Sequence, residues 1–145
     1  MPDLRALAHE ILRDGYLMSL GTYDEGGVWV ADVIYVSQDD FHIYWVSMPE
    51  ARHSKAIAAN PAVACTITAE EAKGKERALQ ISGHAQRLDG PRFELEMLHR
   101  RKRGMQDPTR PGEMIEDGHV WYELVPDRIE LIHSERFDFD RQRVL

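Results

Sequence analysis

The chain has 145 residues, 43% hydrophobic and 30% charged, and its 25 acidic against 18 basic residues give a formal net charge of −7. These values are typical of one globular domain spanning residues 1–145, and the acidic balance argues against nucleic acid as the main partner, because a phosphate backbone requires a basic surface. No apolar run is long enough to cross a membrane, and the N-terminus has no basic segment followed by an apolar core, so we expect neither a membrane span nor an export signal.

The N-terminal segment has the spacing of an amphipathic helix. Asp3 can cap this helix and Gly15 can end it in a left-handed conformation, and its apolar residues recur at i, i+3 and i+4: Leu4, Leu7, Ala8, Ile11 and Leu12. Two runs rich in β-forming residues follow, 16–23 and 28–37, on either side of Asp24-Glu25-Gly26-Gly27. This arrangement predicts a β-hairpin.

A strand followed by a short helix is predicted between residues 41 and 61. Aromatic and β-branched residues alternate from Phe41 to Ser47, and Pro49 and Asn60-Pro61 are suited to the start and end of a helix. Its first two turns carry three basic residues, Arg52, His53 and Lys55. Free backbone N–H groups and the positive end of the helix dipole favour an anion there, so a phosphate site is one interpretation. A solvated basic face is the other.

Two further strands are expected at 62–68 and 77–88, joined by a charged loop over 70–76. The single cysteine, Cys65, lies on the apolar face of the first, where we expect it to be buried, and a reducing, cytoplasmic setting is the default. In the second strand, Gly83 indicates either a close approach of another backbone or a bend, and a bend is favoured in a small barrel.

The last third of the chain predicts a helix, a long loop and two strands. The helix follows Asp89-Gly90-Pro91 and ends in the basic run 100–103, which we interpret as a solvated last turn. The loop 104–118 is expected to be mobile or to cover a site. Strands at 119–125 and 128–134 are separated by Pro126-Asp127, which completes an antiparallel α+β barrel with two to three short helices.

The motifs of several common catalysts and metal sites are missing. The seven histidines are scattered, with no i, i+4 pair and no HExxH, so a metal site has weak support. The sequence has no P-loop, no GxSxG and no GxGxxG. Such a pattern is compatible with a protein whose reactive atoms belong to a cofactor, since the protein then supplies binding and orientation.

Four segments, in this order and spacing, resemble the pyridoxamine 5'-phosphate oxidase-like family of FMN-binding split barrels: LMSLGTYDEGGVWVADVIYV, YWVSMPEARHSKAIAANPAVACTI, QISGHAQRLDG and VWYELVPDRIELIHSERFDFDRQRV. The resemblance implies a split β-barrel, Greek-key-like and antiparallel, that forms a homodimer with FMN at the subunit interface. It places Arg52 and His53 at the positions of the basic pair with which the family binds the FMN phosphate. Val46 and Ser47 correspond to the strand end that touches the flavin and its phosphate tail.

The same resemblance places the strand Asp32, Val33, Ile34 and Tyr35 against the isoalloxazine ring. Lys55 is added to the phosphate site by charge and proximity, and Trp121 and Arg141 are expected to close the pocket, in part from the partner subunit. For Trp121 a core position is the alternative.

The sequence departs from the oxidase itself. Ser37 stands where the oxidase ends its second strand with lysine, and its C-terminal arginine motif is matched only loosely, by Arg136 and Arg141. These departures argue against pyridoxamine phosphate as substrate. The leading hypothesis is an FMN-dependent oxidoreductase acting on a small molecule. The alternatives are a flavin, deazaflavin or haem-binding module or sensor without turnover, and a purely structural dimerisation barrel.

Overall fold

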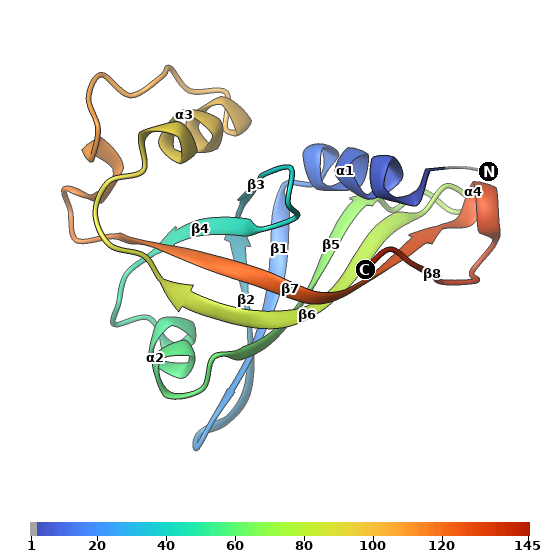
Figure 1. Cartoon of the computed structure of the whole chain (residues 1–145), viewed down its shortest axis with the longest axis horizontal. Helices are drawn as coiled ribbons and strands as arrows, with labels where there is room; N and C mark the ends of the chain where they lie inside the picture. The colour runs from blue at the N-terminus through green and yellow to red at the C-terminus, as the bar shows by residue number, and fades with distance from the viewer. Residues whose placement is uncertain (1–2) are drawn as a thin grey trace.

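The computed structural model describes residues 3–145 as a strongly curled antiparallel sheet with helices packed around it (Figure 1). The strands are β1 (Leu17–Asp24), β2 (Gly27–Ile34), β3 (Val36–Ser37), β4 (Ile43–Ser47), β5 (Ala62–Glu70), β6 (Arg77–Arg87), β7 (Val120–His133) and β8 (Gln142–Arg143). The helices are α1 (Leu4–Asp14), α2 (Arg52–Ala59), α3 (Phe93–Lys102) and α4 (Ser134–Phe137), with a 3-10 turn at Glu113–Ile115. The strand order is β2-β1-β5-β6-β7-β4-β3, with β8 added to β7. The predicted α+β architecture is confirmed.

The concave side of the sheet holds the main core. Because successive side chains in a strand point to opposite faces, every second residue of β1 and β5 is buried, as Met18, Leu20, Val63, Cys65 and Ile67 are. The apolar stripe of α1 closes this core with Leu7, Ala8, Ile11 and Leu12, and Asp3 caps the helix by accepting the N–H groups of Arg5 and Ala6. The predictions for α1's face and for a buried Cys65 are confirmed, and burial raises the pKa of the Cys65 thiol to about 12.

The two strands predicted on either side of Pro126 are in fact one. β7 runs without a break from Val120 to His133, and its register against β6 shifts between Ser82 and Gly83. At this bulge Pro126 lies opposite Gly83, so its missing N–H interrupts no regular ladder. A Cβ on Gly83 would lie 2.2 Å from the carbonyl oxygen of Val125. Close backbone approach at the bulge, rather than a bend alone, therefore requires this glycine.

Three other boundaries differ from the prediction. Gly15 has φ −71° and is not left-handed; it is required because a Cβ there would lie 2.5 Å from Tyr35 Oη. The strand expected over 28–37 is interrupted at Tyr35, which separates β2 from β3. The helix expected from Pro49 begins only at Arg52, since residues 48–51 form a turn in which Ala51 N–H donates to Met48 O. The short elements α4 and β8 were not expected.

The basic run at the end of α3 is not a solvated turn throughout. Lys102 Nζ donates to Tyr35 O at 2.9 Å and lies 3.5 Å from the centre of the Tyr35 ring, and burial lowers its pKa to about 8. Arg101 forms a two-bond pair with Asp107 in the following loop. The prediction that this run is solvated was wrong for Lys102, because α3 packs this face of its last turn against β3.

The long loop 104–118 is anchored to α3 by a buried carboxylate. Glu96 is fully buried and accepts the N–H of Gly112 at 3.0 and 3.1 Å and that of Met114 at 3.3 Å. These contacts hold the start of the 3-10 turn against the helix. Within residues 3–145, none of the helices combines the length and the apolar character needed to cross a membrane.

Candidate functional site

An open cleft of about 500 Å³ lies where the ends of β2 and β4 meet the start of α2. Its lining is mainly apolar, with one carboxylate, one hydroxyl and three imidazoles: Leu17, Asp32, Val33, Ile34, Val46, Ser47, Met48, Ala51, His53, His99 and His119. The strand pairing explains why distant segments meet there. Ser47 at the end of β4 pairs with Val120 at the start of β7, so His119 is brought beside the strand end. We call this the strand-end cleft.

Six of the residues singled out from the sequence lie together in this cleft: Asp32, Val33, Ile34, Val46, Ser47 and His53. Ser47 Oγ and His53 Nε2 are 2.7 Å apart, so the strand end and the first turn of α2 are joined by a hydrogen bond. Burial lowers the pKa of His53, which favours the neutral ring at neutral pH. α2 has no side-chain cap at its N-terminus, and its first N–H groups are left for another acceptor.

The two predicted cations on α2 lie apart from the lining of the cleft. Arg52 stacks on the Trp29 ring, with its guanidinium carbon 4.2 Å from the ring centre, and donates to Gly26 O at 3.3 Å. It therefore rests on the β1–β2 hairpin. Lys55 is exposed on the helix surface, one turn beyond the cleft.

Tyr35, Trp121 and Arg141 also lie elsewhere. Tyr35 is fully buried and donates to the carbonyl of Leu12 at 2.7 Å, and this burial raises its pKa. Trp121 is fully buried in a second core cluster under α3, which is the core position weighed as its alternative. Arg141 is exposed and donates to Gln80 Oε1 at 2.9 Å on the convex side of the sheet, away from the cleft lining.

Two histidines of the cleft were missed from the sequence. His99 comes from α3 and is 4% exposed, with its ring edge-on to Trp121. Burial, with help from Arg103 and Lys102, lowers its pKa to about 4, so it is uncharged at neutral pH. His119 precedes β7 and bonds Asp117 Oδ1 through Nδ1 at 2.7 Å. No local pattern signals either residue, because only the packing of α3 and the β4–β7 pairing bring them to the cleft.

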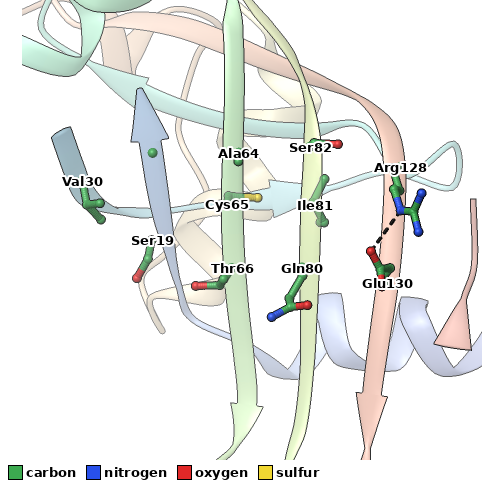
Figure 2. A pocket seen from close by; sticks show the side chains of 11 residues that line it. Ser19, Val30, Ala64, Cys65, Thr66, Gln80, Ile81, Ser82, Arg128 and Glu130 are labelled. Atoms are coloured by element: carbon green, nitrogen blue, oxygen red, sulfur yellow. Dashed lines mark hydrogen bonds and ion pairs between the residues drawn. The ribbon is translucent and has the colours of Figure 1, made fainter. Parts of the chain in front are cut away.

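A second hollow, of about 410 Å³, lies on the convex side of the sheet (Figure 2). Its lining residues come from β2, β1, β5, β6 and β7, and three of them are small: Gly21, Ala64 and Ser82. An ion pair between Arg128 and Glu130, 2.9 Å apart, borders one side. We call this the convex groove. It adjoins the strand-end cleft, because Ser19 of the groove donates to Asp32 of the cleft at 2.7 Å.

A protein-family model described as pyridoxamine 5'-phosphate oxidase matches residues 4–133, most of the chain. The chain belongs to the pyridoxamine 5'-phosphate oxidase-like family. The family resemblance predicted from the four sequence segments is confirmed. No curated protein sequence matches the chain.

Solved structures with this family's fold superpose on nearly the whole chain. General Stress Protein 26 from Bacillus anthracis has 19% identity and a TM-score of 0.69, and the match covers 98% of this chain and 99% of that one. An FAD-binding protein from Mesorhizobium loti has 16% identity and a TM-score of 0.68, covering 89% and 92%. A haem-binding protein from Mycobacterium smegmatis has 18% identity and a TM-score of 0.70, covering 99% of this chain but 59% of that one. At these identities the likeness shows the fold alone, and the predicted split barrel is confirmed.

Proposed function

We propose that the chain is an FMN-dependent oxidoreductase that uses the strand-end cleft. One observation carries the proposal: the cleft gathers Ser47, His53 and the uncapped N-terminus of α2 beside the apolar strand ends of β2 and β4. Such a junction combines donors for a phosphate with a flat apolar wall for an aromatic ring system. The family match supports this choice of cofactor class.

The residues present fit a flavin mononucleotide. Ser47 Oγ, the His53 ring and the first N–H groups of α2 would hold the phosphate, and Val33, Ile34 and Val46 would face the ring. Bound there, the flavin would supply two-electron transfer, while the chain supplies orientation and access. Arg52 would strengthen phosphate binding only by leaving Trp29, on which it rests. Lys55 would act through its charge at longer range.

We further propose that two copies associate through the convex groove. Its lining includes the small residues Gly21, Ala64 and Ser82, and exposed Val28 and Val30 extend the apolar surface along β2. A second copy lying on this face would also border the cleft, since Asp32 connects the two hollows. Arg141, exposed beside Gln80, would reach that partner, whereas the buried Trp121 would not. Sedimentation should give twice the monomer mass of 16.7 kDa, and a monomer at micromolar concentration would refute the association.

Titration with FMN, followed by quenching of its fluorescence, tests the cofactor proposal. We expect wild-type protein to bind FMN, and Ser47→Ala and His53→Leu to bind it about tenfold more weakly, because each removes a hydrogen-bonding group worth about 1.4 kcal/mol. His42→Gln is the matched control, since His42 bonds Glu123 outside the cleft. Absence of FMN binding by the wild type would end the proposal. Stopped-flow reduction by NADH or NADPH, compared with free FMN, then separates an enzyme from a module that binds without turnover.

A haem-binding module is the second candidate, and the three histidines of the cleft favour it. A neutral imidazole would be a suitable ligand for haem iron, and the lowered pKa values of His53 and His99 favour the neutral ring. Titration with haemin distinguishes the two functions, because an imidazole-bound haem gives a sharp Soret band that is lost when the ligating histidine is replaced. The same titration with a deazaflavin tests the third cofactor that this fold is considered to bind.

A further inference from the structure

We propose that His119, oriented by Asp117, is the group that exchanges protons with the substrate in the strand-end cleft. The proposal rests on the oxidoreductase function above and adds a catalytic residue to it. No catalytic side chain could be predicted from the sequence. The argument depends on which groups line the cleft, on how the His119 ring is held, and on what the reduction of an organic acceptor requires.

The lining of the cleft leaves few groups able to donate a proton. It contains no lysine, arginine, tyrosine or cysteine, so the candidates within residues 3–145 are Asp32, Ser47 and three histidines. Asp32 already accepts the hydroxyl hydrogen of Ser19 at 2.7 Å. Ser47 is too weak an acid, and its hydroxyl is joined to His53 Nε2. His99 is 4% exposed and stays neutral because burial lowers its pKa to about 4. The His119 side chain is 35% exposed, so solvent can return a proton to it, whereas Nε2 of His53 is joined to Ser47.

Asp117 fixes the orientation and the tautomer of the His119 ring. Its Oδ1 accepts from His119 Nδ1 at 2.7 Å and from the His119 backbone N–H at 3.2 Å. The hydrogen bond from His119 keeps the pKa of Asp117 below its usual value, so the carboxylate is ionised and Nδ1 carries the hydrogen. Nε2 is then the nitrogen that takes up and releases a proton, and no protein group in the described part of the chain hydrogen-bonds to it.

The segment that carries the pair is held at both ends. On one side, Val120 pairs with Ser47, which itself lines the cleft. On the other, Glu96 holds the N–H groups of Gly112 and Met114. An acid–base group must stay within hydrogen-bonding distance of the reacting atom, and these contacts limit its motion.

The chemical step is a proton transfer to a polarised double bond, such as the C=O of a carbonyl compound or quinone. A bound, reduced flavin would supply the hydride to the acceptor, and the π electron pair of the double bond would move to the oxygen. That pair forms an O–H bond as the Nε2–H bond of the imidazolium breaks, and the ring is left neutral until solvent protonates it. The titratable groups around His119 are Asp117, which bonds it, and Asp32 of β2, His53 of α2 and His99 of α3, which line the same cleft.

The first test is made on the protein without cofactor. Nitrogen-15 NMR should show His119 with hydrogen on Nδ1, and Asp117→Asn should lose this tautomer preference. Adding FMN should shift the His119 signals while those of His42, which pairs with Asp40 and Glu123 outside the cleft, stay in place. Unchanged His119 signals on a protein that does bind FMN would overturn the proposal, whereas a protein that binds no FMN would overturn the proposed function instead.

The second test follows single-turnover reduction of 1,4-naphthoquinone by the dithionite-reduced FMN complex between pH 5.5 and 9. We expect the wild-type rate to fall as pH rises, because the imidazolium donor is lost. His119→Gln should bind FMN within about twofold of wild type, react about 100-fold more slowly and lose this pH dependence. Asp117→Asn should slow the reaction less than His119→Gln does, since the imidazole is still present but is no longer held in one orientation and tautomer. His42→Gln should match wild type. An His119→Gln variant with wild-type rate and pH profile would refute the assignment.

Discussion

Replacing Glu96 with alanine should loosen the loop that leads into the cleft. Glu96 is fully buried and accepts two backbone N–H groups, from Gly112 in two contacts of 3.0 and 3.1 Å and from Met114 at 3.3 Å. An N–H left without its acceptor costs about 1–3 kcal/mol, and the longer bond belongs at the low end of that range. The loss is partly offset because a charge no longer has to be desolvated. We therefore expect the variant to lose about 3 kcal/mol of unfolding free energy, and Glu96→Gln, which keeps one acceptor, about half as much.

Urea unfolding followed by tryptophan fluorescence measures this loss, and hydrogen exchange locates it. Exchange should quicken by about two orders of magnitude over residues 104–118, with little change in β5 and β6, because the contacts join only α3 and the loop. Glu94→Ala is the matched control: it is exposed on the same helix and should cost less than about 1 kcal/mol. If Glu96→Ala unfolds like the Glu94 control, or if exchange in the loop is unchanged, the carboxylate does not anchor the loop and the reasoning is wrong.

Three further outcomes follow from single contacts. Gly83→Ala should lower the urea midpoint by an amount equivalent to at least about 2 kcal/mol, because a Cβ would lie 2.2 Å from Val125 O; wild-type stability would contradict the bulge geometry. Tyr35→Phe should cost about 1–2 kcal/mol in the same assay, since the buried carbonyl of Leu12 loses its donor; a neutral result would show that water replaces it. Since burial lowers the pKa of His99 to about 4, the unfolded state binds the extra proton, and stability present above pH 6.5 should fall by up to about 3 kcal/mol as pH drops towards 4. Urea curves of wild type and His99→Gln across that window isolate the effect, and parallel curves would refute it.

Much of the fold could be predicted because its signals are local. The helical spacing of Leu7, Ile11 and Leu12 and the alternation in β5 each describe one element and the face it buries. The hairpin turn after Asp24 is likewise encoded in adjacent residues. The errors arose where a partner strand overrides local chemistry. Pro126 normally ends a strand, yet the bulge opposite Gly83 lets β7 continue through it.

The sequence by itself determined the family, the antiparallel α+β barrel and the half of the cleft that is built from contiguous residues, such as Val46, Ser47 and His53. Those residues follow one another through a strand and the helix after it, so their proximity needs no tertiary information. Only the tertiary structure decided that Arg52 rests on Trp29 and that His99 and His119 complete the cleft. The physical reason is that these contacts join segments far apart in the chain, and their positions are set by helix packing and strand pairing rather than by any local pattern.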